Sequence, residues 1–474
     1  MSLAVACGWT LLRSFIVAML AVPVCWKLEA VLDSLPRAGR RTVWFLLAAA
    51  FLAPELLIGY AYSNFQLSLV RYPALNESLY GFLVLLKVIP VGVAVARFSP
   101  APPVSSEALH IHRLSGGGAS FSSLIRGPAR IHLCTASVVF LLSFQEFEMA
   151  SFFATASWTV WLYDQQVGGL MLSESLRFAI MPVVTEALVL VPLVLLATQG
   201  NSLAADPEKE RRPQSRTVIF CLLTYLPVAI IALIAIPFAI MGSGILDGLR
   251  ILLTDTLQRN GFLISVATAA GFAVPAAILS HSLAGLLLNY CVLRRESWKS
   301  RAWIAAACLP GLFGSLSISL ALVALFQIGL LNPLYDTIIP LMIGTTLFLL
   351  PRAVLLRLLL NSVTSGESSH LAAMLTDSPI SEQRQVGRRL IWHERYRRQL
   401  GLLGVLYFWG YMELTLAALL APVGMIAAPV RLYAQMHYGR NEVLSATSLL
   451  TVMIPVAAFF VVVGIIKLIH QSRS

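Results

Sequence analysis

The chain has 474 residues, of which 58% are hydrophobic and only 12% charged, and its mean hydropathy is +0.80. These values exclude a soluble globular protein, and the absence of alternating segments of about 10 residues excludes a transmembrane β-barrel. The net charge of +11 does not by itself indicate nucleic-acid binding, because Lys and Arg of membrane proteins collect in cytoplasmic loops.

Apolar segments long enough to cross a bilayer, about 20 residues each, recur along the whole chain. The sequence therefore predicts an all-α polytopic membrane protein with about 11 transmembrane helices. The expected spans are 7–28, 43–63, 78–98, 132–157, 174–198, 216–241, 262–291, 302–328, 334–357, 400–424 and 444–468. The first is interpreted as a retained helix, because no small-residue cleavage site follows it.

The loops between these spans alternate in charge, and the basic ones follow the odd-numbered spans. The cytoplasmic side attracts Lys and Arg, so the N-terminus is expected outside and the C-terminus in the cytoplasm. The basic loop residues include Lys27, Arg40, Arg41, Arg113, Arg126, Arg130, Lys209, Arg211, Arg212, Arg294, Arg295, Lys299, Arg384, Arg388, Arg389, Arg397 and Arg398.

Short sequence patterns occur twice, 255 to 267 residues apart. Pro54-Glu55 before Leu79-Tyr80 matches Pro310-Gly311 before Leu334-Tyr335, and Gln145-Glu146-Phe147 matches Met412-Glu413-Leu414. The repeat predicts two homologous halves, which usually enclose a working site between them. We expect five spans in 1–198, a cytoplasmic linker at 199–215 and six spans in 216–474. The first half then lacks a counterpart of span 216–241, so either that helix was lost or the true start lies upstream of Met1.

Two cytoplasmic loops, 99–131 and 358–399, are much longer than the others and occupy equivalent places in the two halves. Long loops inside a compact bundle are usually functional. We interpret them as a docking surface for a cytoplasmic partner. The alternative is a solvated basic surface without a partner.

The stretch from Glu413 through Met425 to Tyr433 resembles the permeases of binding-protein-dependent ABC importers, specifically the fused two-half ferric-iron type. The stretches Leu334–Ala353 and Gln145–Glu148 are similar to the same family. The resemblance implies two permease-like halves that move a small ion or polar solute, ferric iron among the candidates, by alternating access. It also implies a cytoplasmic ABC ATP-binding subunit, an extracytoplasmic solute-binding protein and a location in the cell inner membrane.

Permeases of this family carry a cytoplasmic coupling motif, Glu-Ala-Ala followed after three residues by Gly, in a helix-turn-helix that binds the ATPase. The resemblance assigns this role in the first loop to Glu107, Ala108 and the late Gly118. In the second loop it assigns the role to Ala372 and Ala373, with Asp377 in the place of the Gly. These departures leave a second hypothesis open, a non-transporting membrane scaffold derived from a permease.

Several ionisable residues lie inside apolar segments, where charges are costly and usually face a cavity or a partner. Glu146 and Glu413 form the pair related by the repeat, and Glu148, Lys87 and Arg352 are further candidates within apolar segments. These five could line a pathway for a cation, as in a secondary transporter, which is a third hypothesis. The alternative is structural: each Glu accepts hydrogen bonds from a neighbouring helix or pairs with Lys87 or Arg352.

No pattern in the sequence indicates catalysis or a bound cofactor. The triplet Gly116-Gly117-Gly118 lacks the Gly-Lys-Ser/Thr of a nucleotide-binding loop, and His110 and His112 lack further ligands for a metal. We therefore expect no catalytic residues, no metal site and no cofactor. ATP hydrolysis would belong to a partner chain, and the remaining partner is the lipid bilayer rather than nucleic acid.

Overall fold

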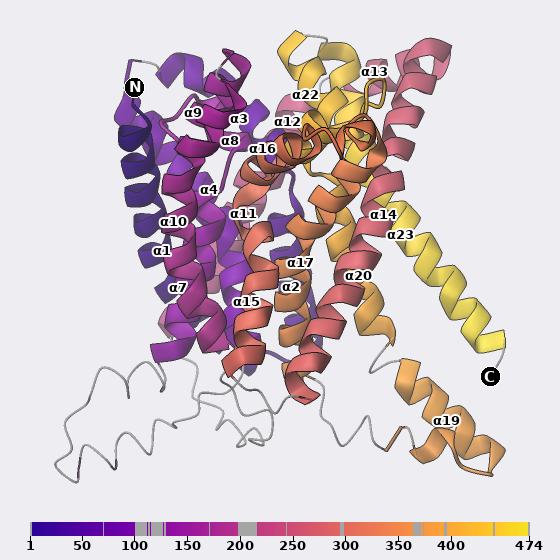
Figure 1. Cartoon of the computed structure of the whole chain (residues 1–474). Helices are drawn as coiled ribbons and strands as arrows, with labels where there is room; N and C mark the ends of the chain where they lie inside the picture. The colour runs from indigo at the N-terminus through magenta and orange to yellow at the C-terminus, as the bar shows by residue number, and fades with distance from the viewer. Residues whose placement is uncertain are drawn as a thin grey trace. The chain divides into compact units, whose positions relative to one another are not determined.

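The computed structural model describes eleven main stretches of the chain and three isolated residues (Figure 1). They are residues 2–69, 71–99, 129–169, 171–197, 216–242, 244–293, 298–363, 371–372, 374–392, 396–438 and 441–472, with 111, 114 and 127. Every element in these stretches is a helix. The predicted all-α class is confirmed.

Seven of the described helices are long and apolar enough to cross a membrane. Three further pairs of helices become candidate spans if each bent pair counts as one, which gives up to ten. The expected span 132–157 corresponds instead to a 16-residue helix, α7 (Ala129–Phe144), followed by a break. The protein therefore has the helices of a multi-pass membrane protein, and the described helices do not give the predicted number of eleven.

Contacts divide the described chain into two compact units. Unit 1 comprises Met1–Ser243 with Glu296–Ala305, and unit 2 comprises Gly244–Arg295 with Ala306–Ser474. The segment 216–241, which the sequence assigns to the second half, belongs to unit 1 by its contacts. The predicted linker 199–215 lies outside the described residues.

Unit 1 is built around three long helices, α1, α4 and α7, each of which packs on the other two. Around them α3 packs on α8, α10 packs on α7 and α9, and α11 packs on α1 and α2. The helices are α1 (Leu3–Ser34), α2 (Arg37–Leu52), α3 (Glu55–Leu69), α4 (Pro73–Phe98), α7, α8 (Glu148–Phe153), α9 (Trp158–Val167), α10 (Leu172–Ala197), α11 (Arg216–Ile230), the π-helical η1 (Ile231–Ala235) and α12 (Ile236–Gly242).

Unit 2 is built around α14, α17 and α20, which also pack on one another. In this unit α16 packs on α21, α22 packs on α14 and α23, and α13 packs on α23. The helices are α13 (Ile245–Thr254), α14 (Thr256–Leu293), the part of α15 (Trp298–Leu312) from Ala306 onward, α16 (Gly314–Phe326), the 3-10 helix η2 (Asn332–Leu334), α17 (Ile338–Val363), α19 (Ser381–Ile391), α20 (Arg397–Tyr411), α21 (Leu414–Leu420), α22 (Ala428–Tyr438) and α23 (Asn441–Ser472).

Three expected spans are broken by sharp bends. The bend is 66° between α2 and α3, 90° between α15 and α16, and 54° between α20 and α21. At the second bend a Cβ on Gly311 would lie 1.9 Å from the Leu347 carbonyl oxygen and 2.6 Å from Pro351 Cδ, and Gly314 has φ +72°. Only glycine allows both the close approach to α17 and the left-handed backbone, so these two residues fix the bend.

The repeated Leu-Tyr pair does not mark equivalent positions. Tyr80 lies inside α4 and is buried, whereas Tyr335 follows η2 ahead of α17 and is 37% exposed. Both α4 and α17 continue past an internal proline, Pro90 and Pro351 respectively, and each has 26 residues.

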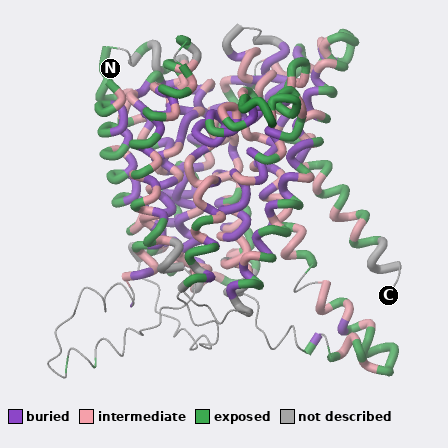
Figure 2. Tube along the Cα trace, viewed as in Figure 1, coloured by how far each residue is buried: buried purple, intermediate pink, exposed green. Residues whose placement is uncertain are grey.

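Many apolar side chains point out of the helical units. The most apolar window of α23 is only 11% buried, and its exposed residues include Phe460, Val461, Val462 and Leu468 (Figure 2). Apolar surface on this scale would be unfavourable in water. It agrees with helices that face lipid.

Candidate functional site

Glu146 lies in the break between α7 and α8 and is only 6% exposed. Its carboxylate accepts hydrogen bonds from the N–H groups of Met149 at 2.5 Å and Ala150 at 3.0 Å, both in the first turn of α8. The hydroxyl of Tyr80 on α4 donates a third, at 2.5 Å. A carboxylate at this position satisfies N–H groups that have no partner within the helix. The side chain of Glu146, one residue before the N-cap Phe147, thus caps the N-terminus of α8 and connects it to α4.

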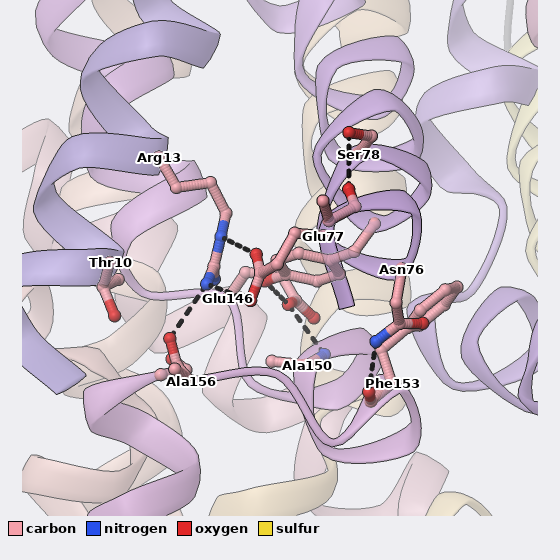
Figure 3. A network of polar contacts seen from close by, with 12 residues as sticks. Thr10, Arg13, Asn76, Glu77, Ser78, Glu146, Ala150, Phe153 and Ala156 are labelled. Carbon is pink, nitrogen blue, oxygen red and sulfur yellow. Dashed lines mark hydrogen bonds and ion pairs between the residues drawn. The ribbon is translucent and has the colours of Figure 1, made fainter. Parts of the chain in front are cut away.

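Arg13 on α1 lies beside this cap and links three elements (Figure 3). Its Nε is 3.0 Å from Glu77 Oε2, its Nη2 donates to the Ala156 carbonyl at 2.8 Å, and its guanidinium lies 4.7 Å from the centre of the Tyr80 ring. A guanidinium over an aromatic face and a paired carboxylate stabilise each other's position. The connection between α8 and α9 is thereby held to α1 and α4.

The same connection has two further ties to these helices. The Trp158 N–H donates to Thr10 Oγ1 at 3.2 Å, and the Asn76 side chain donates to the Phe153 carbonyl at 3.0 Å (Figure 3). Buried backbone groups outside regular helix need such partners in an apolar environment. The network therefore provides hydrogen-bond partners for backbone groups of the non-helical segment in unit 1.

Lys87 on α4 stabilises the other break of unit 1, between α2 and α3. Its ammonium donates to the carbonyls of Phe51, at 2.9 Å, and of Ala53, and lies 3.5 Å from Glu55 Oε1. The end of α2 presents unpaired carbonyls and a partial negative charge, and the start of α3 favours an acidic residue. The Lys87 ammonium therefore binds the carbonyls at the end of α2 and also pairs with the carboxylate at the start of α3.

Glu413 and Arg352 belong to unit 2 and have separate contacts. Glu413 is the N-cap of α21, and its carboxylate accepts a long hydrogen bond of 3.5 Å from the Leu416 N–H. Arg352 donates to the Phe348 carbonyl at 2.6 Å and stacks on two rings, 3.6 Å from the Phe348 centroid and 5.3 Å from that of Trp409. The contacts described for each side chain lie within unit 2.

The sequence-predicted pathway residues thus fall into two sets. Glu146, Glu148 and Lys87 lie in unit 1, and Glu413 and Arg352 lie in unit 2. Glu148 is the first residue of α8, where its negative charge suits the helix N-terminus. Both repeat-related glutamates cap a short helix that follows a break, which agrees with the structural alternative. A pathway lined by all five remains a prediction.

The second long loop contains a helical hairpin formed by residues 371–391. Residues 371–376 are helical apart from Ala373, which lies outside the described residues, and a turn at 377–380 leads into α19. Ala372 is buried within the hairpin, and a Cβ on Gly387 would lie 2.6 Å from the Thr376 backbone nitrogen. The two helices therefore cross in direct backbone contact at Gly387.

Asp377, which stands where the family motif has Gly, is exposed in the turn of this hairpin. Among the described residues the only non-glycine residue with a positive φ is Ala154, so Asp377 needs no left-handed backbone. Side chains close the turn instead: the Ser378 hydroxyl is 2.6 Å from Gln383 Oε1, and the Ile380 N–H donates to Ser378 Oγ. The departure from Gly therefore causes no strain here.

The remaining coupling residues predicted from the sequence, Glu107, Ala108 and Gly118 of the first loop, lie outside the described residues. In the described part of the chain no group of three or more His, Cys, Asp or Glu residues could hold a metal ion. Comparison of the chain with family models, curated proteins and solved structures gave no match. The function therefore has to be argued from the residues and their geometry.

Several residues of these networks were not identified from the sequence. Arg13, Glu77 and Tyr80 lie far from Glu146 along the chain, and only the packing of α1, α4 and α7 brings them together. Glu77 and Arg13 are both ionisable residues in or beside apolar segments, which was an available signal. The sequence gave no indication of the role of Gly387, because a glycine in a basic, polar segment is typical of an ordinary loop.

Proposed function

We propose that the chain is the membrane-spanning permease subunit of an ABC-type importer, in which two permease-like halves move a small ion or polar solute by alternating access. A separate cytoplasmic ATPase supplies the energy. The observation that carries this proposal is the helical hairpin of residues 371–391 between α17 and α20. A helix-turn-helix at this place is the form that the resemblance to importer permeases implies for ATPase docking.

The surface of the hairpin supports a protein partner. Its exposed apolar side chains are Leu371, Met374, Ile380 and Val386, which are 49–62% exposed. The basic residues Arg384, Arg388 and Arg389 lie on the same short helix, α19. Apolar anchors within a polar rim are typical of protein interfaces. A groove with an apolar floor and acidic edges would complement this surface.

A common order of elements supports two homologous halves of about five and six spans. Each unit has a bent helix pair, a 26-residue helix containing a proline, a helix broken before a Glu-capped short helix, and two closing helices. The central triplets α1, α4, α7 and α14, α17, α20 pack in the same way within their units. Such duplication is common in transporters.

The remaining parts of the proposal rest on the resemblance and on loop charge. The substrate is a small ion or polar solute, with ferric iron as one candidate, delivered by an extracytoplasmic solute-binding protein. The basic loops lie in the cytoplasm, which leaves the N-terminus outside and the C-terminus inside the cell inner membrane. The long first loop, 99–131, contributes a second contact to the ATPase.

The proposal is tested by purifying the tagged full-length chain from its native membranes in mild detergent and identifying its companions by mass spectrometry. We expect a near-stoichiometric protein with a nucleotide-binding loop, and ATP hydrolysis by the complex in lipid nanodiscs. Substrate-loaded binding protein should stimulate that hydrolysis. Recovery of the intact chain without any ATPase would reject the importer. Gradient-driven uptake by the chain alone would then indicate a secondary transporter, and no uptake would indicate a scaffold.

A further inference from the structure

Glu186 on α10 is a fully buried carboxyl inside a candidate membrane span, Leu172–Leu193. Its relative exposure is 0%, and no donor in the described residues reaches either carboxylate oxygen in hydrogen-bond geometry. The Gln145 side chain, at the break after α7, is near enough to interact with it. None of the contacts described for Glu146 or Lys87 involves this group.

The surroundings of Glu186 offer no compensating charge. α10 packs on α7 and α9, whose titratable residues are Arg130, His132, Cys134, Tyr163 and Asp164. Arg130 and His132 lie at the far end of α7, roughly 20 Å from Gln145 at 1.5 Å per residue. Asp164 carries the same sign of charge as an ionised Glu186. No ion pair within the described residues involves Glu186.

Glu146 provides a contrast within the same unit. Its carboxylate receives two backbone N–H groups and the Tyr80 hydroxyl, so three donors stabilise the negative charge. Glu186 has the same burial without those donors. An ionised carboxylate without donors or a cation is very costly in an apolar environment, whereas the neutral acid costs far less. An ionised Glu186 therefore has weaker support from its surroundings than an ionised Glu146.

We propose that Glu186 is a proton-binding site, occupied at neutral pH, with the proton as its ligand. One carboxylate oxygen forms an O–H bond with a proton taken from water, and the Gln145 amide is close enough to interact with the neutral acid. The proton is released only when α10 separates from α7 and water or a cation reaches the carboxyl. Such a separation would couple proton release to a movement of unit 1. This inference does not depend on ATPase docking.

Infrared spectroscopy of the full-length chain in lipid nanodiscs tests this directly. A protonated carboxylic acid has a C=O stretching band that a carboxylate lacks. We expect a protonated-carboxyl band at neutral pH whose area falls by one group per chain in Glu186→Gln. Glu174→Gln is the matched control, because Glu174 lies on the same helix but is exposed, and its replacement should leave the band unchanged.

A second variant distinguishes loss of the carboxyl from misfolding of Glu186→Gln. Glu186→Asp keeps a carboxyl at the same site, so the band should persist at a shifted frequency. Identical spectra for the unmodified chain, Glu186→Gln and Glu186→Asp would overturn the proposal, because Glu186 would then be ionised in the bilayer. A band that is lost near pH 4, together with ionisation of the exposed carboxyls, and is absent at pH 6 would overturn it as well.

Discussion

Replacement of Gly387 by alanine is expected to weaken binding of the proposed ATPase to the full-length chain by about 30-fold. The new Cβ would lie 2.6 Å from the Thr376 nitrogen and 2.8 Å from the Leu375 carbonyl carbon, both backbone atoms that cannot move aside. The two helices of the hairpin would separate, and the exposed apolar residues would lose their common surface. Loss of a central part of an interface typically costs about 2 kcal/mol or more, an affinity decrease of about 30-fold. Binding is measured by titrating labelled ATPase onto the chain in nanodiscs.

The matched control for this variant is Gly401→Ala on α20. Nothing lies within 4 Å of the Cβ position at Gly401, so ATPase affinity should stay unchanged. Val386→Glu is a milder test of the same surface, because Val386 is exposed and its replacement need not disturb the fold. Full affinity in both Gly387→Ala and Val386→Glu would show that the hairpin is not the docking surface.

Replacement of Lys87 by methionine is expected to destabilise unit 1 by about 3 kcal/mol, because the variant leaves buried polar groups without their cation. Two carbonyls at the end of α2 and the Glu55 carboxylate lose their partner, while methionine keeps a similar volume and length. The loss of stability therefore comes from the missing charge and not from a cavity. Thermal unfolding in nanodiscs measures the change, with proteolysis near residues 52–55 as a local readout.

Two further variants separate this effect from a general loss of charge. Lys467→Met removes an exposed lysine from α23 and should leave the unfolding temperature unchanged. Addition of Glu55→Gln to Lys87→Met should recover part of the lost stability, because it removes the negative charge that would otherwise lack a cation. Equal stability of Lys87→Met and the unmodified chain would mean that the break between α2 and α3 does not depend on Lys87.

Hydropathy predicted where helices lie, because transfer of apolar segments into a bilayer depends mainly on local composition. It did not predict the breaks within 43–63, 302–328 and 400–424, each of which reads as one apolar segment. The bend at Gly311 depends on contact with α17, about 40 residues further along the chain. A break that tertiary contacts maintain leaves little trace in local sequence.

The candidate residues were found from the sequence more readily than their partners. Glu146 and Glu413 stand out because a carboxylate inside an apolar segment is costly. Their role as helix caps could not be predicted from the sequence, because the positions of the helix breaks were not known. The contact of Glu146 with Tyr80 joins residues that are 66 positions apart in the sequence. Conversely, Asp377 suggested an eroded coupling motif, yet the turn at Asp377 has no positive φ that would need glycine.

The measurement that tests the central claim most directly is site-specific photo-cross-linking from position 374 in living cells. Met374 is 62% exposed on the hairpin, so a photoreactive residue there should disturb neither unit. We predict one dominant cross-linked product that contains an ATP-binding subunit, and no such product from the lipid-facing position 460 on α23. Equal yields of ATPase from both positions, or products from position 374 that contain only lipid, would contradict the proposal that this chain is an importer permease.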